Sequence, residues 1–191
     1  MRYKKIIISI ACICFFNCSF GQFNAFIKNF KKCSLPFIAK AETFDMYTSD
    51  DPYVISETDF VKYLMMENDT FINIKGSASI GYHKYMAVCK LGVYNDFLGV
   101  LYFRYIINEE GNHIQELMLC IFTKKGKLTS AYPISGYYTA NNKQFYSTIF
   151  SEENIEILFY RLDINDEFTS ENVIEKKYLY ITKEGLIQSR K

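Results

Sequence analysis

Residues 97–107, FLGVLYFRYII, and residues 114–122, IQELMLCIF, decide the fold class of this chain. Both runs are rich in β-branched and aromatic residues, and both are apolar at consecutive positions. A strand that is covered on both faces has this composition. Because the turn-forming residues 109–112, EEGN, lie between them, the two runs are predicted to pair as antiparallel neighbours.

The same pattern continues on both sides of these two runs. Strands are also predicted over 86–91, 128–134, 144–150, 155–162 and 173–181, each rich in Tyr, Phe, Ile and Val. Short polar turns separate most of the strands, and such connections join antiparallel neighbours. The second part of the chain is therefore predicted to be an antiparallel meander.

Two short helices are predicted before the meander. The first begins near Phe23, carries apolar residues at helical spacing and ends before Leu35 because Pro36 follows. The second is predicted over 57–67, with Ser56 as its N-cap. The expected fold class is α+β, with both helices packed on one face of a strongly curved sheet or half-barrel of about seven to eight strands.

The N-terminus has the three parts of a secretory signal. Basic residues in 1–5 precede the apolar run 6–16, and small residues at Ser19 and Gly21 favour a cut before Gln22. The apolar run is shorter than the roughly 20 residues that a transmembrane helix needs. We expect residues 1–21 to be a signal peptide and residues 22–191 to be one α+β domain, exported to the periplasm, the cell surface or the medium.

Cys18 offers an alternative for the same segment, because it directly follows the apolar run. Lipidation at Cys18 would leave the mature protein anchored to a membrane by an acyl chain. The mature chain has no second apolar stretch long enough for a transmembrane helix. Export is predicted in either case.

The charge balance argues against a nucleic-acid partner. The chain has 22 Lys and Arg against 21 Asp and Glu, for a formal net charge of +1. Proteins that bind nucleic acid through phosphate neutralisation are more basic than this. No sequence pattern indicates a cofactor.

Three cysteines, Cys33, Cys89 and Cys120, follow the predicted leader. Cys89 and Cys120 lie in strand-like runs, so a disulfide between them is one expectation in an oxidising compartment. Three buried thiols are the alternative, since Cys also behaves as a small apolar residue. The spacing matches no metal-binding motif, and we predict no metal site.

Catalytic motifs are incomplete in this sequence. His83 follows the loop 76–81, GSASIG, but Ser79 lacks the first glycine of a nucleophile elbow. His113 falls in a predicted hairpin turn, where a solvated side chain is expected. An exported hydrolase that uses His83 with Ser79 is an alternative, whereas the residues favour a non-enzymatic protein.

Four tyrosines gather around the turn-like residues 133–136, PISG. They are Tyr132, Tyr137, Tyr138 and Tyr146. Tyrosines beside a turn can form a recognition surface, because each supplies a large contact area and a polar tip. The alternative is that Tyr and Phe fill and border the core of a β protein that has no Trp.

Several local motifs resemble small exported and lipid-anchored proteins of Bacteroidota, most of which have no assigned function. The resemblance is carried by Gly21-Gln22, Phe26 and Phe30, residues 34–37 (SLPF), residues 125–128 (KGKL) and residues 135–137 (SGY). It implies a cell-envelope location and a helix-plus-meander domain. It implies no catalytic residues.

The sequence thus favours a cell-envelope binding module without enzymatic activity. The expected partner is a protein, a peptide or a glycan, bound through one sheet face or a loop rim. An immunity or inhibitor protein matched to a secreted toxin is a further alternative.

Overall fold

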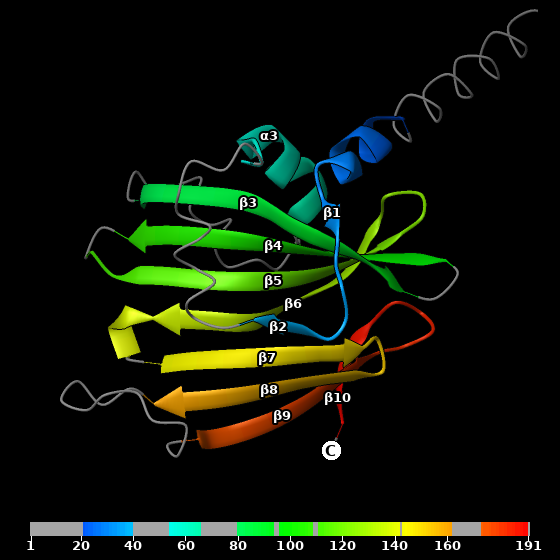
Figure 1. Cartoon of the computed structure of the whole chain (residues 1–191). Helices are drawn as coiled ribbons and strands as arrows, with labels where there is room; N and C mark the ends of the chain where they lie inside the picture. The colour runs from blue at the N-terminus through cyan, green and yellow to red at the C-terminus, as the bar shows by residue number, and fades with distance from the viewer. Residues whose placement is uncertain are drawn as a thin grey trace, which may run out of the picture.

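The computed structural model describes residues 21–39, 54–65, 80–93, 96–108, 111–141, 143–161 and 173–190. The strands form one open, mixed, ten-stranded sheet (Figure 1). Its order is β1-β3-β4-β5-β6-β7-β8-β9-β10, and β2 lies beside β7. Among the described residues, no helix has the length and apolar character needed to cross a membrane.

The meander from β3 to β10 is antiparallel throughout. Its strands are β3 (Ile80–Val93), β4 (Phe97–Asn108), β5 (His113–Thr123), β6 (Leu128–Tyr138), β7 (Lys143–Ser151), β8 (Asn154–Arg161), β9 (Val173–Ile181) and β10 (Ile187–Arg190). The predicted order of hairpins is therefore present, and the chain is mainly antiparallel β-sheet.

The expected α+β class is wrong, because the chain is mostly β and its sheet has more strands than the predicted half-barrel of seven to eight. Three short strands were missed: β1 (Lys31–Lys32), β2 (Phe37–Ala39) and β10. β1 pairs in parallel with β3, and β2 pairs with β7. Strands of two to four residues are too short to show an alternation that sequence reasoning can detect, and β1 and β2 also pair with segments far away in the chain.

The helical structure is also shorter than predicted. Residues 21–28 are helical, but the segment expected to continue the helix towards Leu35 contains β1 instead. The second helix consists of α3 (Glu57–Asp59) and the π-helical turn η1 (Phe60–Leu64). Ser56 caps it as predicted, since its Oγ accepts a hydrogen bond from the N–H of Asp59 at 3.1 Å.

Two apolar clusters lie on the sheet. The helical cluster joins both helical segments to one side of β3, β4 and β5, and it includes Phe23, Phe30, Leu64, Tyr102 and Phe122. The sheet cluster joins side chains of β3 to β9, including Leu101, Phe103, Leu119, Ile155 and Ile157. β4 and β5 contribute to both clusters, so they are covered on both sides as their sequences predicted.

The sheet opens between β6 and β7. Only the β6 residues 136–138 pair with β7, at Lys143–Phe145 in the part of the chain that the structure describes. Further along β7, the residues of β2 take the place of β6. Figure 1 shows the segment from β1 to β2 running in front of the strands to reach this position.

A disulfide joins Cys33, which directly follows β1, to Cys89 on β3. The expected Cys89–Cys120 pair is therefore wrong. Cys89 belongs to the sheet cluster and Cys120 to the helical cluster, so the two side chains lie on opposite sides of the sheet. Strand β4 also lies between the strands that carry these two cysteines. The sequence alone does not show the register of the strands, so it could not exclude this pair.

Candidate functional site

A row of tyrosine and glutamine side chains crosses the sheet near the ends of its strands. Each member is the direct cross-strand partner of the next, and the order is Lys84, Tyr105, Gln115, Tyr137, Gln144 and Tyr160. Direct partners in a sheet project from the same face. We call this set the tyrosine–glutamine row. From Tyr105 to Tyr160, aromatic rings alternate strictly with amides.

The row lies at the end of the sheet that carries the 3-10 turn η3 (Thr139–Asn141). β4 ends and β5 begins at this same end, and η3 follows β6 there (Figure 1). Lys84, Tyr105, Gln115 and Tyr137 are half-buried. The meander therefore presents polar groups of separate strands together at one edge of its apolar core.

Hydrogen bonds order the hairpin ends beside the row. The Tyr105 hydroxyl lies 2.7 Å from Nδ1 of His113, and their rings meet nearly edge to face. The backbone N–H of His113 donates to Oγ1 of Thr139 at 2.8 Å. The start of β5 is thus tied both to β4 and to η3. These contacts limit the movement of Tyr105, a central member of the row.

The other end of the row is buried and aromatic. Gln144 and Tyr160 are each 6% exposed. The amide Nε2 of Gln144 donates to the hydroxyl of Tyr146, whose ring centroid lies 5.4 Å from that of Tyr160. Gln144 is therefore held in place by its neighbours. Among the described residues, the side chains of Lys84, Gln115 and Tyr137 form no hydrogen bond, and all three are half-buried.

A buried ionic network lies on the other side of the same strands. Arg104 Nε donates to Glu116 Oε2, and the Tyr138 hydroxyl donates to Glu116 Oε1. Burial raises the pKa of Tyr138, and the neighbouring negative charge of Glu116 raises it further. The phenol therefore keeps its proton and remains a donor to the carboxylate.

Tyr132 takes a different position from the row. Its hydroxyl accepts a hydrogen bond from Lys177 Nζ at 3.0 Å, and it packs against the sheet cluster. Lys177 also lies 5.8 Å above the ring of Phe159. The hydrogen bond to Tyr132 raises the pKa of Lys177, although partial burial opposes this. Lys177 therefore links β9 to β6 as a cation.

The structure divides the four tyrosines that the sequence singled out. Tyr137 belongs to the row and Tyr146 contacts it through Gln144, whereas Tyr132 and Tyr138 are engaged elsewhere. Sequence reasoning missed Tyr105, Gln115 and the other row members. The turn predicted from the sequence at 109–112 could have indicated one of these pairs. Tyr105 and Gln115 lie at similar distances on either side of it in the sequence, and they are cross-strand partners in β4 and β5.

The catalytic alternative rested on His83 and Ser79. His83 is exposed on β3, with its ring centroid 5.5 Å from that of Tyr85. Ser79 and Cys18 lie outside the described residues. In the part of the chain that the structure describes, no group of three His, Cys, Asp or Glu side chains is placed to hold a metal ion.

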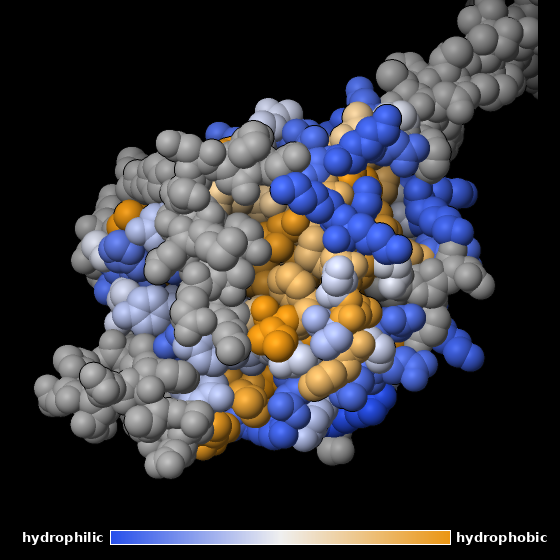
Figure 2. Space-filling view, in the orientation of Figure 1, coloured by the Kyte–Doolittle hydropathy of each residue, from blue (hydrophilic) through white to orange (hydrophobic). Residues whose placement is uncertain are grey.

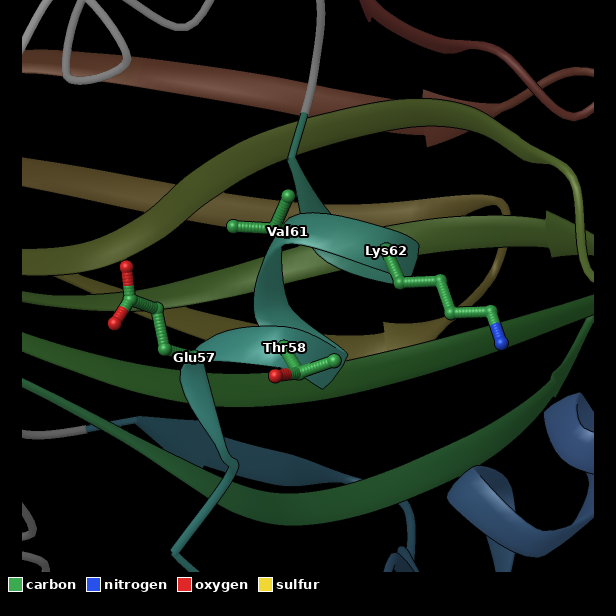
Figure 3. A pocket seen from close by; sticks show the side chains of 4 residues that line it. All are labelled: Glu57, Thr58, Val61 and Lys62. Atoms are coloured by element: carbon green, nitrogen blue, oxygen red, sulfur yellow. The ribbon is translucent and has the colours of Figure 1, made fainter. Parts of the chain in front are cut away.

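A shallow depression lies over the second helical segment. It has a volume of about 370 Å³ and is lined by Glu57, Thr58, Val61 and Lys62. Figure 3 shows that all four side chains come from successive turns of α3 and η1. A depression formed by one helical segment does not enclose a ligand as a pocket between elements does. The row is therefore the stronger candidate site.

Comparison with known proteins gives no relative to guide the assignment. A scan against protein-family models, a search of curated proteins and a search of solved structures each find no match to the chain. The function must therefore be argued from the row and its surroundings.

Proposed function

We propose that this chain is an exported cell-envelope protein that binds a carbohydrate without transforming it. The observation that carries the proposal is the tyrosine–glutamine row, in which aromatic rings and amides alternate across neighbouring strands. The leader-like residues 1–21 support export, because they combine a basic start, an apolar run and a small-residue cleavage site.

The chemistry of the row matches that of a sugar chain. A pyranose presents hydroxyl groups around its edge and C–H groups on its faces. An amide side chain both donates and accepts hydrogen bonds, as paired sugar hydroxyls require. A tyrosine ring offers an apolar face for the C–H groups and a hydroxyl at its tip.

The length of the row favours an oligosaccharide over a single sugar. Neighbouring strands lie about 4.8 Å apart, so the three interstrand steps between the half-buried members Lys84 and Tyr137 span roughly 14 Å. A peptide would instead use an unpaired strand edge or deep apolar pockets. The row crosses the strands and has neither, so an extended glycan fits it better.

The test is binding of the exported protein to an array of defined oligosaccharides, followed by titration calorimetry with the best ligand. Tyr137→Ala and Gln115→Ala should each weaken binding about tenfold, which corresponds to the loss of one stacking or hydrogen-bonding group. Tyr178→Ala is the matched control, because Tyr178 is 41% exposed on β9 and lies outside the row.

Two results would contradict the proposal. One is an array on which no oligosaccharide is bound above background. The other is a ligand whose affinity falls equally with Tyr178→Ala and with the row variants.

A further inference from the structure

We propose that the surface around the helical residues 21–28 binds an anionic membrane through lipid headgroups. This surface is formed by lysines from separate segments, with the exposed apolar side chain of Leu35 on the segment that follows β1. It shares no residue with the tyrosine–glutamine row, so the inference does not depend on carbohydrate binding.

Eight lysines surround the helical residues, and we call them the lysine patch. They are Lys28 within the helix, Lys31 and Lys32 on β1, Lys62 on η1, Lys90 on β3, and Lys124, Lys125 and Lys127 at the β5–β6 turn. All except the half-buried Lys90 are exposed. Figure 2 shows hydrophilic residues gathered over this part of the molecule.

Specific contacts bring three of these segments to the helix. Lys90 is the cross-strand partner of Lys32, and its Nζ donates to the carbonyl oxygen of Ile27 at 3.3 Å. Lys62 Nζ donates to Gln22 Oε1 at 2.5 Å. The patch is therefore held together by the fold and does not depend on chance positions of flexible side chains.

The β5–β6 turn reaches the same helix through Gly126. A Cβ at Gly126 would lie 2.5 Å from the ring of Phe23, so the turn backbone rests directly on that ring. Lys125 and Lys127 flank the glycine and are exposed. The turn thus carries its charges to the side of the helical residues.

An apolar side chain is exposed on the segment that directly follows β1. Leu35, three residues after Lys32, is 43% exposed. Basic residues combined with exposed apolar residues are typical of proteins that lie on a membrane surface.

Lipid explains both features, whereas a soluble polyanion explains only the charges. Leu35 gains nothing from a dissolved polyphosphate but gains from contact with acyl chains. The position of the patch agrees with this occupant, because Gln22, to which Lys62 binds, directly follows the apolar leader. A chain retained at the leader or at Cys18 would hold the patch against the bilayer.

The experiment uses the protein as its host exports it, with the N-terminus established by mass spectrometry. Co-sedimentation is measured with phosphatidylcholine vesicles that contain one quarter phosphatidylglycerol, and with pure phosphatidylcholine vesicles. Each lysine near an anionic surface contributes about fivefold to binding, so Lys28→Gln with Lys32→Gln should weaken it roughly 25-fold. Added salt should weaken binding of the unaltered protein as well.

A matched control variant distinguishes the effect of where the lysines lie from the effect of the net charge of the protein. Lys176→Gln with Lys183→Gln removes the same charge from β9 and its turn, and it should leave vesicle binding unchanged. Leu35→Asn should weaken binding without changing its salt dependence. All variants carry the same N-terminus, so an acyl chain would not distort their comparison.

Three outcomes would overturn the proposal. Equal binding to the two vesicle types would exclude recognition of anionic headgroups. Equal loss in both double lysine variants would show a general charge effect. Binding to inorganic polyphosphate as tight as to vesicles, with no effect of Leu35→Asn, would identify a polyanion site instead.

Discussion

Arg104 and Glu116 lie directly opposite each other on β4 and β5, and the guanidinium donates to the carboxylate within the protein interior. Their side chains are only 7% and 3% exposed. The next residues towards the row, Tyr105 and Gln115, project from the opposite face because side chains alternate along a strand. The ion pair therefore fixes the register that places these row members opposite each other.

Removing one partner of this ion pair should cost more than removing both. Glu116→Leu leaves the Arg104 charge buried without its carboxylate, which typically costs about 3–5 kcal/mol. Arg104→Met with Glu116→Leu replaces the pair by apolar side chains and should retain most of the stability. Urea unfolding measures both free energies. Equal losses in the single and double variants would contradict this account.

Tyr138 should make stability sensitive to alkaline pH. Its pKa is raised above the ordinary value of 10.0 in the folded protein, so the folded state holds the phenolic proton more tightly than the unfolded state. The resulting stabilisation is complete below pH 10 and is lost as the pH rises towards the folded pKa. Tyr138→Phe should remove this component of the pH dependence.

The same substitution should lower stability at neutral pH, because Glu116 loses a buried donor, at a cost of about 1–3 kcal/mol. Unfolding is measured in urea from neutral to alkaline pH. Tyr137→Phe is the control, since Tyr137 neighbours Tyr138 and its side chain has no hydrogen bond to another described residue. An unchanged alkaline slope in Tyr138→Phe would contradict the assignment.

The strands that the sequence predicted best are those with a strong local signal. β4 and β5 are apolar on both faces, and Ser56 caps its helix through a residue three positions away. β1 gives no such signal, because Lys31 and Lys32 are polar and pair with a strand some 60 residues later. Short strands of this kind are fixed by tertiary pairing rather than by local propensity.

The candidate site was only partly visible for the same reason. Tyr137 lies close in sequence to other tyrosines, and this density drew attention to it. Gln115 and Gln144 are isolated in the sequence and become neighbours of Tyr137 only through the register of β5, β6 and β7. The row is a property of pairing, which a single sequence does not display.

The Cys33–Cys89 disulfide should contribute substantially to stability. It closes a long loop, with a sequence separation of 56, and the chain-entropy relation gives about 4 kcal/mol for a loop of this length. Cys33→Ser with Cys89→Ser should therefore unfold at lower urea concentration and should lose sensitivity to reducing agents. Cys120→Ala should keep that sensitivity, because Cys120 belongs to the other apolar cluster. Loss of redox sensitivity in Cys120→Ala would contradict the pairing.

Gly126 should tolerate no side chain, because two separate effects act at this position. Its φ of +85° is unfavourable for other residues, and an added Cβ would lie 2.5 Å from the Phe23 ring. Gly111→Ala isolates the first effect, since Gly111 has a φ of +77° and no atom within 4 Å of an added Cβ. We expect Gly111→Ala to cost about 1 kcal/mol and Gly126→Ala to cost about 1–3 kcal/mol more, from the forced displacement of Phe23. Thermal unfolding of the two variants measures the difference, and equal losses would mean that the turn does not rest on the helical residues 21–28.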